Sequence, residues 1–139
     1  MADEAMGDTG FVVAILNQND DDHQSCLDIY KAQHGYIIVP QSALAEITYM
    51  LNRNGGSKLV INFLHQIPNL KFRFIALEGA DFRRTLELLE KYADTRVDFV
   101  DVSVAAIAER LGISKILTLD KRDFSIIRPK HVEYFELQP

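Results

Sequence analysis

The fold of this chain is decided by residues 98–120, which read DFVDVSVAAIAERLGISKILTLD. Apolar residues recur there at helical spacing and predict a helix over residues 101–111 with one inward face: Val104, Ile107, Ala108 and Leu111. Gly112 is typical of the position just past a helix end. The apolar residues Ile116–Leu119 then predict a short buried strand. A helix that leads into a buried strand is the repeating unit of a parallel sheet.

The rest of the chain repeats this alternation. Further strands are predicted at Tyr36–Val39, Phe72–Ala76 and Val132–Phe135. The helices expected between them span residues 11–17, 23–31, 41–53, 57–67 and 80–92, with Gly55 and Gly56 as a break between two of them. Short strands separated by helices imply right-handed crossovers and a mostly parallel sheet covered on both faces. The expected fold class is therefore α/β.

Size and composition fit one globular domain, residues 1–139. The chain is 47% hydrophobic and 25% charged, and 15 basic against 20 acidic residues give a net charge of -5. A single cysteine, Cys26, excludes an internal disulfide and fits a reducing, cytoplasmic location. No apolar run approaches the ~20 residues that a membrane span needs. The acidic first residues differ from a signal peptide, which begins basic and continues apolar.

Five carboxylates each stand beside a different apolar segment of the chain: Asp8, Glu46, Asp98, Asp101 and Asp120. Ligand sites of parallel sheets lie outside the carboxyl ends of the strands. Asp120 directly follows a predicted strand, and Asp8 would do so if a strand precedes it. Carboxylates brought together there would repel one another unless a hard cation lay between them. The pattern therefore favours a Mg²⁺- or Mn²⁺-dependent phosphodiesterase.

Each of these acids also has a purely structural interpretation. Asp101 lies three residues before Val104 and heads the inward stripe, but Asp98 and Asp101 could equally form a helix cap. Asp120 could be a turn aspartate, a role that Asp123 could fill as well. Glu46 flanks an apolar stripe, as boundary glutamates often do.

Taken in order, four short motifs resemble those of the PIN-domain nucleases, specifically the VapC-like toxin group. They are Asp8-Thr9-Gly10, Glu46 in a helix after the second strand, residues 98–112 and residues 116–124. The resemblance covers essentially the whole chain. It implies a three-layer α/β/α fold and a Mg²⁺- or Mn²⁺-dependent endoribonuclease, the toxin of a type II toxin–antitoxin pair. It also implies a cognate antitoxin protein that blocks the site, and commonly a homodimer.

The resemblance assigns a role to each acid by its position. Asp8, Glu46 and Asp101 match the core metal-binding acids of the family, and Asp98 and Asp120 match its additional acidic positions. Thr118 matches a hydroxyl that helps to hold the cluster. The chain departs from the family at residues 1–7, MADEAMG, because an apolar first strand usually stands there and this segment is weak strand material. Whether it forms a strand is left open.

The expected reaction is hydrolysis of an RNA phosphodiester by one or two metal ions. No histidine pair has zinc spacing, so oxygen ligands and a hard metal are expected. Several basic residues could contact the RNA backbone: Arg53, Lys58, Lys121, Arg122, Arg128 and Lys130. Two alternatives are a catalytically silent PIN-like domain that binds RNA or protein, and a phosphotransfer domain with a covalent aspartate. Lys115 precedes its strand, which disfavours the second.

Overall fold

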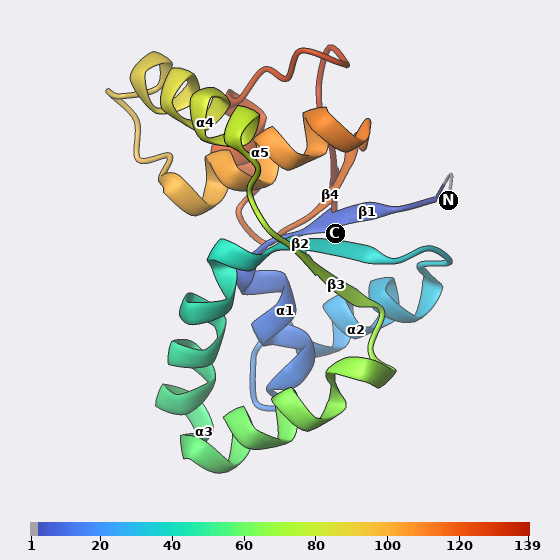
Figure 1. Cartoon of the computed structure of the whole chain (residues 1–139). Coiled ribbons are helices and arrows are strands. Elements are labelled where there is room, and N and C mark those ends of the chain that lie inside the picture. Colours follow the sequence, from blue (N-terminus) through green and yellow to red (C-terminus); the bar gives the residue numbers. More distant parts are fainter. Residues whose placement is uncertain (1–2) are drawn as a thin grey trace.

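The computed structural model, which describes residues 3–139, has one five-stranded sheet at its centre (Figure 1). Its strands are β1 (Ala5–Gly7), β2 (Ile37–Pro40), β3 (Phe72–Ile75), β4 (Lys115–Leu117) and β5 (Glu136–Gln138). Their order is β3-β2-β1-β4-β5, and every neighbouring pair is parallel. The expected α/β class with a mostly parallel sheet is confirmed.

Helices cover both faces of this sheet, as Figure 1 shows. The helices are α1 (Thr9–Leu16), α2 (His23–Ala32), α3 (Leu44–Gln66), α4 (Gly79–Lys91), α5 (Phe99–Leu111) and α6 (Lys121–Ile126), with short 3-10 helices at Gln41–Ala43 and Ile67–Asn69. One apolar core lies between the sheet and α1, α2 and α3, and a second lies between the sheet and α4 and α5. The three layers implied by the family resemblance are present.

Alternate strand residues supply the two cores, because successive side chains of a strand point to opposite faces. In β2, Ile37 and Val39 enter the first core, whereas Ile38 enters the second. In β4, Leu117 enters the first core and Ile116 the second. A strand buried on both faces can therefore be apolar at every position, as the sequence suggested.

Strand β1 resolves the question left open by residues 1–7. Ala5, Met6 and Gly7 are buried and pair with β2 on one side and β4 on the other, so this short segment is the central strand. Its neighbours compensate for its weak strand propensity. At Gly7 an added Cβ would lie 2.8 Å from Ile37 Cγ2, so a small residue is needed there. Residues 1–2 lie outside the described part of the chain.

Two expectations about the last third of the chain were wrong. The strand expected at Val132–Phe135 lies at Glu136–Gln138 instead, because Glu136 N–H donates to Ser114 O and Thr118 N–H donates to Gln138 O. Phe135 is buried in the second core. Leu111 was expected in the inward stripe of α5 but is 41% exposed, since it is the last helical residue before Gly112 turns left-handed.

Two helices also differ from expectation. The break at Gly55 and Gly56 is a kink within α3, where Gly56 has φ 74° and ψ -176°. Helix α6 was not expected at all, because its six residues are too few to show a periodic pattern. Within residues 3–139, no helix combines the length and the apolar character needed to cross a membrane.

Candidate metal centre

The amino-terminal turns of four helices meet at the carboxyl edge of the sheet. Asp8 follows β1 and caps α1, Asp120 follows β4 and caps α6, and Asp98 caps α5. Glu46 lies in the first turn of α3. The positive end of each helix dipole stabilises a carboxylate at such a position. These acids line one cleft of about 420 Å³, together with Asp101 and Asp123.

Asp8 is one of the two buried acids of the cleft, with Asp123. Its Oδ1 accepts a hydrogen bond from Phe11 N–H at 3.0 Å, and its Oδ2 accepts one from the Thr118 hydroxyl. Burial raises the pKa of Asp8 to about 6, and the nearby charges of Asp120 and Glu46 act in the same direction. The two hydrogen bonds oppose this shift in pKa without cancelling it.

Asp98 and Asp101 form a reciprocal capping box at the start of α5. Asp98 Oδ1 accepts from Asp101 N–H at 3.0 Å, and Asp98 N–H donates to Asp101 Oδ2 at 3.1 Å. Burial, followed by the charge of Asp98, raises the pKa of Asp101 to about 7. The structural interpretation of this pair is therefore correct, and the capped carboxylate of Asp101 still faces the cleft.

The tightest group of potential ligand atoms comprises Asp101, Asp120 and Asp123, whose carboxylate oxygens lie within 4.8 Å of one another. Asp123 was not among the expected site residues, yet it is only 4% exposed. A signal for it is present in the sequence. The spacing Asp120-x-x-Asp123 repeats Asp98-x-x-Asp101, and Asp120 Oδ1 likewise accepts from Asp123 N–H, at 3.3 Å.

The structure brings all five expected carboxylates into one cleft, but only two of them belong to the tightest group. Asp8, Glu46 and Asp98 line the cleft outside the group of Asp101, Asp120 and Asp123. Burial is the first cause that raises the pKa of Asp120, and its contact with Asp123 raises it further. The pKa values of Asp8, Asp101 and Asp120 are all raised, and the cleft offers only carboxylate oxygens as ligands. Such a set of ligands fits a hard divalent cation.

Thr118 links the two strand-end aspartates. Its buried hydroxyl donates to Asp8 and accepts from Asp120 N–H at 2.8 Å. The hydroxyl thus orients the carboxylate that follows β1 and the backbone that follows β4. The family resemblance implies that this hydroxyl helps to hold the cluster, and these two contacts are the kind that such a role requires.

The basic residues expected to contact RNA are all exposed, but their surroundings differ. Lys121 and Arg122 immediately follow Asp120 at the cleft. Lys130 pairs instead with Glu87 at 3.7 Å, and Arg128 stacks on Tyr134 with 4.7 Å between guanidinium carbon and ring centre. Arg53 and Lys58 lie on either side of the α3 kink, and Lys58 lines a separate cavity there.

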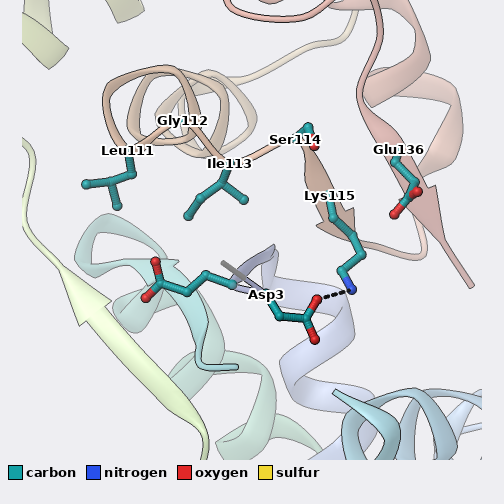
Figure 2. Close-up of a pocket in the computed structure, with 8 residues that line it drawn as sticks. Asp3, Leu111, Gly112, Ile113, Ser114, Lys115 and Glu136 are labelled. Atoms are coloured by element: carbon teal, nitrogen blue, oxygen red, sulfur yellow. Dashed lines mark ion pairs between the residues drawn. The ribbon is translucent and has the colours of Figure 1, made fainter. Parts of the chain in front are cut away.

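A cavity of similar size, about 430 Å³, lies at the opposite edge of the sheet (Figure 2). There the amino ends of β4 and β5 provide Lys115 and Glu136. Lys115 and Asp3 point toward each other and form an ion pair at 3.5 Å. The charges of this cavity are therefore partly balanced within it, in contrast to the acidic cleft.

Known proteins are similar to this chain in sequence and in fold. Ribonuclease VapC26 of Mycobacterium tuberculosis is 24% identical over 122 residues, which are 88% of this chain and 90% of that protein. The crystal structure of M. tuberculosis VapC20, a toxin that cleaves the sarcin–ricin loop, superposes with a TM-score of 0.79 at 22% identity, covering 93% of this chain and 98% of that one. A toxin–antitoxin complex from Klebsiella pneumoniae superposes with a TM-score of 0.66 at 15% identity, covering 88% and 92%.

The family itself is shown by sequence. The PIN domain family matches residues 5–128, which include all the acids of the cleft. The expected resemblance is thereby confirmed, and this chain belongs to the PIN domain family.

Proposed function

We propose that this protein is a metal-dependent endoribonuclease that hydrolyses RNA phosphodiester bonds, and that it is the toxin of a type II toxin–antitoxin pair. The observation that carries the proposal is the single acidic cleft at the carboxyl edge of the sheet, with three carboxylates within 4.8 Å. The similarity to Ribonuclease VapC26 supports RNA as the substrate. An RNA substrate and a single buried thiol both fit the cytoplasm.

In this proposal the metal ligands are Asp8, Glu46, Asp98, Asp101 and Asp120, and the structure adds Asp123 as a sixth candidate. Mg²⁺ or Mn²⁺ is the proposed metal, because every candidate ligand is a carboxylate oxygen. When bound, such an ion lowers the pKa of a water molecule and offsets the charge that develops on the phosphate. Thr118 holds Asp8 and the backbone of Asp120 in place for this role.

The RNA backbone is proposed to approach over Lys121 and Arg122, because these exposed cations follow Asp120 directly. Arg53, which lies in α3 two turns beyond Glu46, is a further proposed contact to the RNA backbone. Arg128 and Lys130 are less suited, since both side chains already contact other residues.

The proposed partners are a cognate antitoxin that covers the acidic cleft and a second copy of this chain. Solved structures of similar fold include a toxin–antitoxin complex and VapBC2 of Rickettsia felis bound to promoter DNA. An antitoxin gene next to the gene of this protein, and a stable complex on co-expression, would support the pairing.

The function is tested by incubating purified protein with RNA in Mn²⁺, in Mg²⁺ and in EDTA. We expect cleavage with either metal, none in EDTA, and a loss of at least a hundredfold in Asp101→Asn. The matched control is Asp21→Asn, the same change at an exposed aspartate between α1 and α2, which should cut like the wild type. If the wild type binds Mn²⁺ but leaves RNA intact, the silent PIN-like alternative holds instead.

A further inference from the structure

One basic residue, Arg96, stands among the six acids that line the cleft in the described part of the chain. Its Nε donates to Asp123 Oδ1 at 3.2 Å, and its Nη2 lies 3.9 Å from Asp120 Oδ1. Both acids belong to the tight group that includes Asp101. Arg96 therefore contacts the same carboxylates that would hold a cation.

The two contacts of Arg96 differ in strength. The side chain of Asp123 is only 5% exposed, so water solvates its charge poorly and the 3.2 Å hydrogen bond from Arg96 matters more to it. The longer contact joins the partly exposed Asp120 to a guanidinium whose side chain is 63% exposed, and pairs of that kind contribute little. Asp123 is thus the main anchor of Arg96.

Arg96 brings a positive charge to these two carboxylates. A divalent ion held by Asp120 and Asp123 would therefore meet a positive charge already bound to its ligands. The guanidinium must then either move toward solvent, which its exposure permits, or remain and repel the ion.

We propose that Arg96 is a positioning residue that acts as an internal counter-cation of the metal centre. It holds Asp120 and Asp123 together in the metal-free protein and competes with the divalent ion for them. Arg96 thereby lowers the affinity of the cleft for metal. This inference rests on the proposed function for the identity of the cleft as a metal centre, but its test requires no RNA.

The test measures Mn²⁺ binding by isothermal titration calorimetry for four proteins: wild type, Arg96→Gln, Arg96→Lys and Arg83→Gln. Arg96→Gln should bind Mn²⁺ about tenfold more tightly, a change of about 1.4 kcal/mol. The metal-free form of Arg96→Gln should also melt at a lower temperature, because its carboxylates lose their counter-charge. Arg96→Lys keeps the charge and should stay within about threefold of the wild-type Kd.

Arg83→Gln controls for the change in net charge, because Arg83 is an exposed residue of α4 and is not among the residues that line the cleft. The proposal is overturned if Arg96→Gln binds Mn²⁺ no more tightly than the wild type, or if Arg83→Gln tightens binding equally. Circular dichroism shows whether each variant is folded.

RNA cleavage then separates this inference from the proposed function. Tighter Mn²⁺ binding in Arg96→Gln with no cleavage by any variant would keep the role of Arg96 and overturn the ribonuclease. Cleavage by the wild type with an unchanged Kd for Mn²⁺ in Arg96→Gln would keep the ribonuclease and overturn the role of Arg96. Absence of Mn²⁺ binding in all four proteins would overturn both.

Discussion

At the scale of single residues, Asp8 carries both a structural and a chemical role. Its carboxylate caps α1 and accepts the Thr118 hydroxyl, yet burial raises its pKa to about 6. Since the pKa of Asp8 is raised despite its hydrogen bonds, the ionised carboxylate lowers the stability of the folded protein. Sites of function commonly reduce stability in this way.

The pH dependence of stability should reveal this cost. In the folded protein the pKa of Asp8 is raised from 3.8 to about 6, so the folded state holds the proton more tightly than the unfolded state. Protonated Asp8 therefore contributes to the free energy of unfolding. This stabilisation is present in full below about pH 4 and is lost as the pH rises through about 6. The pKa of Asp101 is raised to about 7, so the loss of stability continues to higher pH.

Asp8→Asn isolates the effect, because asparagine does not ionise. Between pH 4.5 and 7.5 in EDTA, its free energy of unfolding should rise relative to wild type by about 2 kcal/mol, and most of this rise should come below about pH 6. Urea unfolding at the two pH values measures the difference. Asp21→Asn should show no such trend, and a difference for Asp8→Asn that is independent of pH would contradict the prediction.

Thr118 gives a second test at this scale. Thr118→Val keeps the shape of the side chain but leaves the Asp120 N–H and one Asp8 oxygen without their partner, which should cost about 1–3 kcal/mol. Thr118→Ser keeps the hydroxyl and should retain most of the stability. Urea unfolding of the two variants compares them directly, and a Thr118→Val protein as stable as the wild type would show that the hydroxyl does not stabilise the fold.

At the scale of elements, the kink in α3 depends on one glycine. Gly56 has φ 74° and ψ -176°, a backbone conformation that is essentially limited to glycine. No heavy atom lies within 4 Å of a Cβ placed there, so steric contact with neighbours does not contribute. The kink lets α3 turn back over the first core, where Leu51 and Phe63 are buried on either side of it.

Gly56→Ala should therefore destabilise the protein by about 1–3 kcal/mol through backbone strain alone. The control is Gly79→Ala in the first turn of α4, which likewise has open space around its Cβ but no positive φ. Thermal melting of both variants measures the contrast. We expect no loss for Gly79→Ala, and a Gly56→Ala protein as stable as the wild type would refute the role of the kink.

At the scale of the whole molecule, the cleft joins segments from both ends of the chain. Six acids gather where four helices begin, and the dipoles of those helices offset only part of their repulsion. Under the proposed function, metal binding removes the rest. The folded state should therefore be more stable with metal than without it.

Mn²⁺ should raise the free energy of unfolding by about 2.7 kcal/mol at a concentration of 100 times its Kd. Differential scanning calorimetry with Mn²⁺ and with EDTA measures this gain. Asp101→Asn should lose most of it, whereas Asp21→Asn should keep it. An equal melting temperature with and without Mn²⁺ in the wild type would count against a metal centre in this cleft.

Much of the fold and most of the site followed from sequence. The helix over 101–111, the strands at Tyr36–Val39 and Ile116–Leu119 and the α/β class depend on local spacing, which the structure preserves with shifts of one or two residues at the ends. Asp120 could be placed at a strand end because it directly follows a predicted strand, whereas the place of Asp8 depended on whether residues 1–7 form a strand. These inferences succeeded because each depends only on residues that are close in sequence and on the right-handed crossover between parallel strands.

Tertiary structure alone decided the remaining features. Strand β1 is central although its sequence is weak strand material, because β2 and β4 supply its pairing. Asp123, and not Asp98, joins Asp101 and Asp120 in the tight group, and Arg96 contacts two of these acids. Distances of a few ångströms between side chains depend on how separate helices pack and on the register of distant strands. The sequence by itself therefore determined most of the elements and the acids that they carry. Packing determined that β1 is the central strand and which acids lie close enough to share one cation.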